Sequence, residues 1–270
     1  MSKIKIAVAG CLGRMGQEIT KQILNNVNLV FVGGFEHKAH PQKNKSLKEA
    51  ANINSSINVA DNPIQSIKAA DVLIDFTTPI STLTNVKIAT SNKTAVVIGT
   101  TGMTESQKKI VKNLSKKIPI LMASNMSLGV NLLFSLVQQT ASVLKGEEYD
   151  IEIAETHHKH KKDAPSGTAI SLGDCASIGR KTKLKKVKVF DRTKKTAVRK
   201  KGEIGFSVTR GGEIAGEHTV SFIGKNDRLD LVHKANNRSI FVNGAIQGAI
   251  FISKKKKGLF NMQDMLNKIK

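Results

Sequence analysis

The sequence has few cysteines, no tryptophan and few acidic residues, and each scarcity narrows the possible classes of protein. Two cysteines in 270 residues, Cys11 and Cys175, cannot form a disulfide framework, so we expect reduced thiols and a cytoplasmic location. The chain has no run of about 18 apolar residues and no charged-then-apolar start, so we expect neither a membrane span nor an export signal. With 40% apolar residues and 21 glycines, it is expected to be globular.

The shortage of acidic residues leaves a formal net charge of +22, which raises nucleic-acid binding as an alternative function. Three observations weigh against it. Only seven of the 43 basic residues are arginine, the residue that reads bases and phosphates with two donors. A single tyrosine and no tryptophan leave few platforms for base stacking. The lysines spread along the whole chain, and the triplet Arg210–Gly212 favours a turn, so we expect no specific nucleic-acid partner.

The first 125 residues alternate short apolar runs with helical patterns, which is typical of parallel βαβ units. The following segment, 128–144, predicts a long apolar helix, and the strands after it lack regular intervening helices. The last stretch, 239–270, is expected to return to helix. The sequence therefore predicts an α/β protein with a Rossmann-like parallel-sheet domain and a second α+β sheet domain. Predicted strands are 4–9, 29–35, 72–76, 95–98, 120–123, 149–154, 205–209, 219–222 and 229–232; predicted helices in the first part are 15–26, 80–91 and 105–117.

A glycine-rich segment, VAGCLGRMG, follows the first predicted strand and opens the first helix. Its glycines, Gly10, Gly13 and Gly16, permit a tight turn and a close approach of the backbone to a pyrophosphate. The G-x-x-G-x-x-G spacing is by itself weak evidence, because a strand–helix turn that needs glycine would look the same. Three further features strengthen it. Glu36 ends the second strand, where a carboxylate suits ribose hydroxyls, and DFTTP (75–79) and GTTG (99–102) follow two other strands. Together these features predict dinucleotide binding.

The segment ETHHKHKKDAPSGTA, residues 155–169, gathers three histidines and three lysines immediately before a predicted helix start. A zinc site could use His157, His158 and His160, but the neighbouring lysines would repel a divalent cation and no persuasive fourth ligand is near. A solvated loop is a second alternative. The third is an anion site, in which cationic side chains combine with the amides and hydroxyls of 166–168 at the helix N-terminus. We favour the anion site and expect no metal; a histidine and a lysine there could also donate a proton.

Taken together, these motifs resemble the 4-hydroxy-tetrahydrodipicolinate reductase (dihydrodipicolinate reductase) family of the diaminopimelate route to lysine. The resemblance covers nearly the whole chain. It is carried by VAGCLGRMG, DFTTP, GTTG, ASNMSLGVN, the histidine loop with DAPSGTA, and IGFSVTRGGEIAGEHTVSF. The histidine loop is the most specific of these motifs. It argues against the runner-up, another Rossmann-type dehydrogenase of an amino-acid precursor such as a semialdehyde.

The resemblance implies roles for individual residues. His157 matches the family's proton donor or acceptor and Lys161 a second proton donor. Residues that match the dicarboxylate-binding set are His158, Gly167 and Thr168. Residues that match or adjoin the nucleotide contacts are Gly10, Cys11, Leu12, Gly13, Arg14, Met15, Glu36, His37, Gly99, Thr100, Thr101, Ala123, Ser124, Asn125 and Met126.

The resemblance also implies the domain organisation and the reaction. Residues 1–127 with 237–270 would bind the dinucleotide, and 128–236 would bind substrate and assemble a homotetramer. The reaction would reduce 4-hydroxy-tetrahydrodipicolinate to tetrahydrodipicolinate with NADH or NADPH. Three positions depart from common family members. His37 stands where arginine often grips a 2′-phosphate, so we expect a modest preference for NADH. Met126 replaces a frequent aromatic residue, and Ser124 a common alanine.

Overall fold

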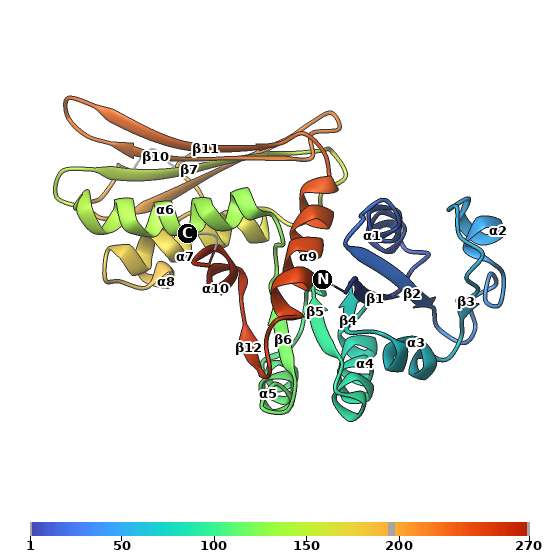
Figure 1. The fold of residues 1–270 in the computed structure, drawn as a ribbon. Helices are drawn as coiled ribbons and strands as arrows, with labels where there is room; N and C mark the ends of the chain where they lie inside the picture. The colour runs from blue at the N-terminus through green and yellow to red at the C-terminus, as the bar shows by residue number, and fades with distance from the viewer. Residues whose placement is uncertain (1, 194–197, 269–270) are drawn as a thin grey trace. The chain divides into compact units, whose positions relative to one another are not determined.

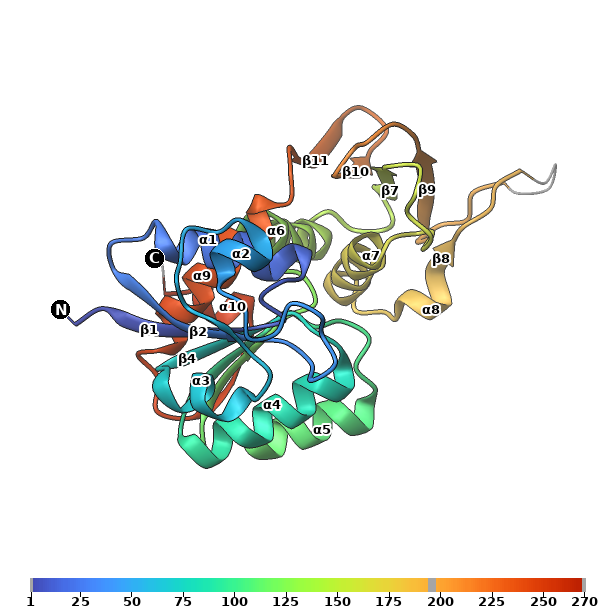
Figure 2. The ribbon, with the colours of Figure 1, turned by 90° about the vertical axis from the view of Figure 1, so that its right-hand side faces the viewer.

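The structure, a computed structural model, describes residues 2–193 and 198–268, and the chain divides into two compact units. Unit 1 comprises Met1–Ser127 and Ser239–Lys270, and unit 2 comprises Leu128–Arg238. Figures 1 and 2 show the two units as ribbons, and each is described here by itself. Within the described ranges, no helix is long and apolar enough to cross a membrane.

Unit 1 is built around a seven-stranded sheet in the order β12-β6-β5-β4-β1-β2-β3, with every pairing parallel. Figure 2 shows α1 and α9 on one face of this sheet and α3, α4 and α5 on the other. The central strands β4 and β5 are apolar except for Asp75 at the end of β4, as expected for strands covered on both faces. The elements are β1 (Ile4–Ala9), α1 (Arg14–Leu24), β2 (Leu29–Phe35), α2 (Leu47–Ala51), β3 (Val59–Ala60), α3 (Pro63–Ala69), β4 (Val72–Asp75), α4 (Pro79–Asn92), β5 (Ala95–Ile98), α5 (Glu105–Leu114), β6 (Pro119–Met122), α9 (Ser239–Ile252), β12 (Gly258–Phe260) and α10 (Met262–Leu266).

Local sequence explains where the helices of unit 1 begin. Thr78 caps α4 by accepting from the backbone N–H of Ser81, and Pro79 occupies the first turn, where no intrahelical donor is lost. Thr104 and Gln107 form a reciprocal capping box at the start of α5. These caps fix the points at which the chain leaves the carboxyl ends of β4 and β5.

Unit 2 is a five-stranded mixed sheet in the order β11-β10-β7-β9-β8. β10 is antiparallel to β7 and β11, whereas β9 is parallel to β7 and β8. The helices α6 and α7 pack against each other and against this sheet around a core that includes Ile153, Leu172 and Phe222. The elements are α6 (Leu128–Val143), β7 (Asp150–His157), α7 (Gly167–Gly179), α8 (Leu184–Val187), β8 (Lys188–Val189), β9 (Ile204–Arg210), β10 (Gly216–Ile223) and β11 (Arg228–Ala235).

The predicted fold class is confirmed; the structure adds the short elements α2, β3 and α3, and two further stretches differ from the prediction. The C-terminal stretch is not helical throughout: α9 ends at Ile252, and β12 pairs in parallel with β6 before α10. Gly258, which begins β12 after the lysine run 254–257, adopts a φ of 129° that favours glycine. The basic run 180–201, for which no element is predicted above, contains α8 and β8, and Arg192 and Arg199 form ion pairs with Glu152; residues 194–197 lie outside the described part.

Candidate active site

The glycine loop of unit 1 joins β1 to α1 at the carboxyl end of the sheet. Gly10 adopts a φ of 65°, a left-handed conformation that favours glycine. A Cβ atom on Gly16 would overlap the carbonyl oxygen of Gly10, so the loop can fold tightly against the helix only with glycine there. α1 has Gly13 as its N-cap, with no side-chain cap among the described residues and no acidic residue in its first turn. Its first amides are therefore suited to an anionic ligand such as a pyrophosphate.

Glu36 lies directly beyond β2 and connects it to the glycine loop. Its Oε1 atom accepts a hydrogen bond of 2.8 Å from the backbone N–H of Leu12. A cavity of about 570 Å³ opens beside it, lined by Gly10, Leu12, Gly13, Phe35, Glu36, His37, Lys38, His40, Asp61, Pro63, Phe76, Thr77, Thr78, Ile80, Ser81, Thr84 and Asn85. A glycine turn, an uncapped helix start and an acidic residue at one cavity are the features that an adenine dinucleotide requires, so the residues fit this cofactor.

Asp75, the last residue of β4, is a buried carboxylate that organises the loops beside this cavity. Its Oδ1 atom accepts hydrogen bonds from the backbone N–H (3.0 Å) and hydroxyl (2.6 Å) of Thr77. The hydroxyls of Thr82 (3.1 Å) and Thr100 (3.3 Å) donate to the same oxygen. Asn85 donates from its amide to Oδ2 at 2.9 Å. The DFTTP and GTTG motifs thus share one hydrogen-bonded centre.

The other residues predicted for the cofactor lie at the carboxyl ends of β1, β5 and β6. The segment 99–101 follows β5, and 123–126 follows β6, with Ala123 donating its N–H to Ile98. Cys11 is buried, and burial raises the pKa of its thiol to about 12, with the charge of Glu36 adding to the effect. The side chain of Met126 is also buried, and its carbonyl lies against Gly244. Ligand contacts at Cys11 and Met126 would therefore involve mainly the backbone.

In unit 2, the histidine loop leaves the end of β7 and returns to the sheet before entering α7. The backbone N–H of His158 donates to the carbonyl of Ile214 at 2.8 Å, and that of Lys161 donates to the carbonyl of His158 at 3.1 Å. Ser166 is the N-cap of α7, with its hydroxyl accepting from Ala169. Gly167 and Thr168 therefore occupy the first turn of α7, where backbone amides attract anions.

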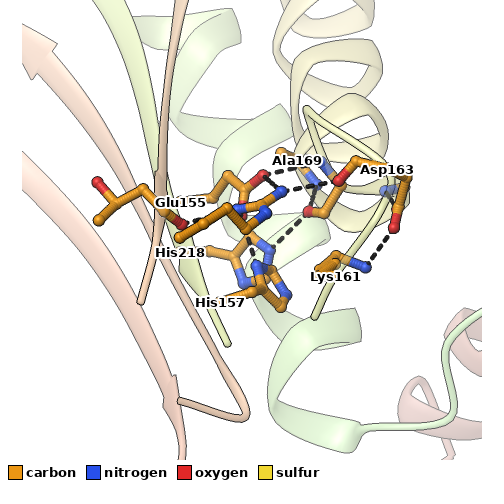
Figure 3. Close-up of polar contacts among 10 residues, drawn as sticks. Glu155, His157, Lys161, Asp163, Ala169 and His218 are labelled. Atoms are coloured by element: carbon orange, nitrogen blue, oxygen red, sulfur yellow. Dashed lines mark hydrogen bonds and ion pairs between the residues drawn. The ribbon is translucent and has the colours of Figure 1, made fainter. Parts of the chain in front are cut away.

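Glu155 is at the centre of this region, although the residues implied by the family resemblance do not include it. Figure 3 shows Glu155, His157 and His218 directed toward one another beside the start of α7. Arg210 donates to both carboxylate oxygens of Glu155, at 2.8 and 2.9 Å, and Ser166 N–H donates at 2.9 Å. The fourth partner is Nδ1 of His157. Burial raises the pKa of Glu155, but the donors from Arg210, Ser166 and His157 outweigh burial, so its pKa lies below the ordinary value.

The two buried histidines of this cluster favour their neutral forms. Burial lowers the pKa of His157, the bond with Glu155 partly opposes the change, and the charges of Lys161 and Arg210 reinforce it. Burial likewise lowers the pKa of His218 to about 4, with His157 adding to the effect. The His218 ring lies edge-on to that of His157, with centroids 5.1 Å apart, and its Nε2 shares a hydrogen bond of 3.1 Å with the Ser166 hydroxyl.

Lys161 lies on the same loop and has its own carboxylate partner. Its Nζ atom is 2.8 Å from Oδ1 of Asp163, and this bond is the main reason that the pKa of Asp163 is lowered. Oδ2 of Asp163 accepts from the backbone N–H of Gly167 at 3.3 Å. Lys161 is close enough to His157 for its charge to lower the imidazole pKa. The two proton donors implied by the resemblance, His157 and Lys161, therefore lie near each other, each beside a carboxylate.

The structure groups the histidines differently from the zinc alternative. His158 and His160 face each other with ring centroids 6.3 Å apart, while His157 lies in the Glu155 cluster. In the described part of the chain, the group whose geometry could hold a metal is Glu155, His157 and His218, with donor atoms within 4.8 Å. Both carboxylate oxygens of Glu155 already accept hydrogen bonds from Arg210. The guanidinium of Arg210 would also repel a metal cation, so this group is poorly suited to bind one.

The sequence does not identify three of these residues as parts of the site, because no local spacing joins Glu155, Arg210 and His218. They lie on β7, β9 and β10, and strand pairing places Arg210 opposite His157 and His218 opposite Glu155. The motif IGFSVTRGGEIAGEHTVSF contains two of the three, but without the sheet register nothing assigns them a role. The triplet Arg210–Gly212 is only partly a turn: Arg210 is the last residue of β9, and the turn begins at Gly212, which has a φ of 54°.

Comparison with known proteins agrees with this geometry. Residues 4–126 match the family described as dihydrodipicolinate reductase, N-terminus, and residues 129–266 match its C-terminus. A 4-hydroxy-tetrahydrodipicolinate reductase from Polynucleobacter necessarius is 40% identical over 97% of this chain and 98% of its own length. One from Buchnera aphidicola is 41% identical over 100% of this chain and 99% of its own length.

A solved structure of a dipicolinate-bound dihydrodipicolinate reductase from Paenisporosarcina superposes with a TM-score of 0.78. It is 26% identical, and the match covers 96% of this chain and 97% of that chain. The family models together span nearly the entire sequence. This chain therefore belongs to the dihydrodipicolinate reductase family, oxidoreductases of the diaminopimelate route to lysine, as the resemblance of its motifs predicted.

Proposed function

We propose that this chain reduces 4-hydroxy-tetrahydrodipicolinate to tetrahydrodipicolinate, with NADH or NADPH bound by unit 1 and the dicarboxylate by unit 2. The observation that supports this proposal most is the histidine loop, which brings two potential proton donors to the N-terminus of α7. A reductase of a cyclic imine dicarboxylate needs both an anion site and a proton source. One loop of unit 2 offers both.

The first turn of α7 would bind one substrate carboxylate. Its amides at Gly167 and Thr168 carry the positive end of the helix dipole, and a substrate carboxylate would compete with Asp163 for the Gly167 N–H. His158 and Lys161 would contribute further donors from the loop. Because Lys161 is paired with Asp163, an incoming carboxylate would compete for the ammonium group rather than meet an unpaired charge.

The chemistry consists of loss of the 4-hydroxyl as water, hydride addition at C4 and protonation of a neighbouring carbon. The bound nicotinamide supplies the hydride. His157 and Lys161 would stabilise the negative charge that develops on the substrate, and one of them would deliver the proton. Since burial holds the pKa of His157 below its ordinary value, its cationic form would depend on the negative charge that a dicarboxylate brings.

The cofactor preference is proposed to be modest and toward NADH. Glu36 suits the two ribose hydroxyls and would repel a 2′-phosphate. His37, Lys38 and His40 line the same cavity and could offset this repulsion, but none has the planar fork of arginine. NADPH would therefore remain usable. No metal is needed, because the proton donors are side chains and the Glu155 oxygens already bind Arg210.

A homotetramer is proposed to form through the face of the unit 2 sheet that points away from α6 and α7. Ala154, Thr219 and Val232 lie side by side on neighbouring strands of that face, with Ala154 and Val232 exposed. A row of small and β-branched side chains suits packing of one sheet against another. We also propose a cytoplasmic location, in keeping with the two free thiols of Cys11 and Cys175.

The test is oxidation of NADH and NADPH with freshly generated 4-hydroxy-tetrahydrodipicolinate, before and after exhaustive chelation. We expect chelation to leave the activity unchanged. His157→Ala and Lys161→Ala should each lower kcat by roughly 10²- to 10⁴-fold, the usual cost of losing a proton donor. Neither should change the dissociation constant of NADH, since both residues belong to unit 2. Unchanged kcat in both variants would contradict the assigned roles, and activity restored only by zinc would contradict the metal-free reaction.

A further inference from the structure

Glu155 is a buried carboxylate next to His157, and neither the motifs nor the family resemblance assigns it a role. Glu155 accepts twice from Arg210 and once from Ser166 N–H, and its Oε2 atom also contacts Nδ1 of His157. The guanidinium and the backbone N–H can only donate, so the carboxylate satisfies them best when it is ionised. An ionised carboxylate at Nδ1 requires that this nitrogen carry a hydrogen, which leaves Nε2 as the atom that gains or loses the catalytic proton.

The backbone on the far side of the imidazole also constrains it. A Cβ atom on Gly216 would lie 2.8 Å from Nε2 and 3.1 Å from Cδ2 of His157, closer than packed atoms allow. The ring therefore occupies space that only glycine leaves open. With Glu155 at Nδ1 and His218 edge-on at 5.1 Å, the imidazole is held from three directions.

Arg210 connects this arrangement to the rest of the loop. Besides its two bonds to Glu155, it donates to the carbonyl oxygen of Asp163 at 2.7 Å. The side chain of Asp163 in turn binds Lys161. One guanidinium on β9 thus contacts the residues that support both proposed proton donors. The arrangement resembles the carboxylate–histidine pairs that fix a tautomer in other enzymes.

We propose that Glu155 is a positioning residue, which Arg210 holds in place and which fixes His157 as the Nδ1–H tautomer with Nε2 available for proton transfer. This proposal rests on the proposed function, because that function gives the proton on Nε2 its role in the reaction. The geometry itself does not depend on the substrate. The charged and titratable groups that surround His157 are Glu155, Lys161, Arg210 and His218, and His233 lies beyond His218.

The decisive measurement is ¹⁵N NMR of the histidine side chains in the wild-type protein, with His157 assigned by the loss of its signal in His157→Gln. We expect neutral His157 to be the Nδ1–H tautomer. The Nε2–H tautomer would overturn the proposal, whatever the enzyme does. If instead the tautomer is as expected and no NADH is oxidised with the dicarboxylate, the proposed function fails while the positioning role stands.

A pair of variants tests the electrostatic part. Removing the carboxylate in Glu155→Gln takes away a contribution that raises the His157 pKa, so this pKa should fall further below its ordinary value. Glu152→Gln is the matched control, because Glu152 lies on the same strand and also pairs with arginines, but its side chain points to the opposite face. It should leave the titration of His157 unchanged. An unchanged or higher His157 pKa in Glu155→Gln would overturn the proposal.

Discussion

Each unit buries one carboxylate at the carboxyl end of a strand, but the two have opposite kinds of partner. Asp75 in unit 1 is 0% exposed, and its partners among the described residues are neutral groups, namely threonine hydroxyls, an asparagine amide and a backbone N–H. Glu155 in unit 2 is 3% exposed and accepts from an arginine, a histidine and a backbone N–H. Neutral partners hold a geometry, whereas a titratable partner makes the carboxylate part of a proton equilibrium.

This difference corresponds to the roles proposed for the two units. A dinucleotide site needs rigid loops with amides and hydroxyls in fixed places, and Asp75 gives the DFTTP and GTTG segments a shared anchor. A site that delivers a proton needs a group whose protonation responds to the ligand. Glu155 and Arg210 provide a fixed pair of charges beside an imidazole whose pKa is lowered by burial. The two carboxylates should therefore fail in different ways when they are neutralised.

The largest expected effect is the contrast in kcat and NADH affinity between two variants that neutralise Glu155 and Asp75 separately. Glu155→Gln should lower kcat by about 10²-fold or more, because His157 loses its orientation and its stabilised tautomer, while NADH affinity stays unchanged. Asp75→Asn replaces an acceptor of several bonds by a group that also donates, so it should weaken NADH binding and lower the free energy of unfolding by about 1–3 kcal/mol. Steady-state kinetics and NADH titration on both variants measure the split. Two variants with the same pattern would remove the distinction.

The features of unit 1 that depend on the local order of residues could be predicted from the sequence. Apolar runs and turn residues placed the central strands of unit 1 within about one residue, and the glycine loop and Glu36 follow from positions along consecutive βαβ units. The short elements α2, β3 and β8 carry too few residues to give a period, so they were not predicted. β12 was missed because its pairing with β6 is set by tertiary contacts rather than by the local pattern.

The grouping of Arg210 and His218 with Glu155 could not be predicted from the order of residues in the sequence. Glu155 and His157 are two residues apart on one face of β7, which is predictable once the strand is known to reach His157. Arg210 and His218 join them only through the parallel pairing of β7 with β9 and the antiparallel pairing with β10. A register shift of one residue would turn both side chains to the opposite face, and no local signal fixes that register.

A smaller effect concerns the acid stability of the protein. Burial lowers the native pKa of His218 to about 4, whereas the unfolded chain should titrate near 6.5. The unfolded state then binds a proton first, so stability should fall as the pH drops from about 6.5 toward 4, by about 2 kcal/mol at pH 5. Urea unfolding at pH 7 and pH 5 measures this loss. His218→Gln should reduce it, and His160→Gln, at an exposed position, should not. Equal pH dependence in His218→Gln and the wild type would exclude His218 as the cause.

The smallest expected effect concerns Glu36, an acidic residue of the cavity proposed for the cofactor, whose neighbours in the lining are His37, Lys38 and His40 rather than an arginine. Its carboxylate accepts from Leu12 N–H, and His37 and His40 stack edge-on with ring centroids 5.4 Å apart along the same cavity. A 2′-phosphate would meet Glu36 as a repulsive charge, with two imidazoles and Lys38 as partial compensation.

His37→Arg supplies a permanent charge and two parallel donors at this position, which suit a phosphate better than an imidazole. We expect the ratio of kcat/KM for NADPH over NADH to rise about tenfold, the equivalent of one charge-assisted hydrogen bond. His40→Arg, three residues along the same cavity, separates a general gain in positive charge from a specific phosphate contact. The gain should also shrink at high salt, because the new contact is between exposed charges. A wild type that strongly prefers NADPH, or a ratio that His37→Arg leaves unmoved, would show that another residue reads the 2′-phosphate.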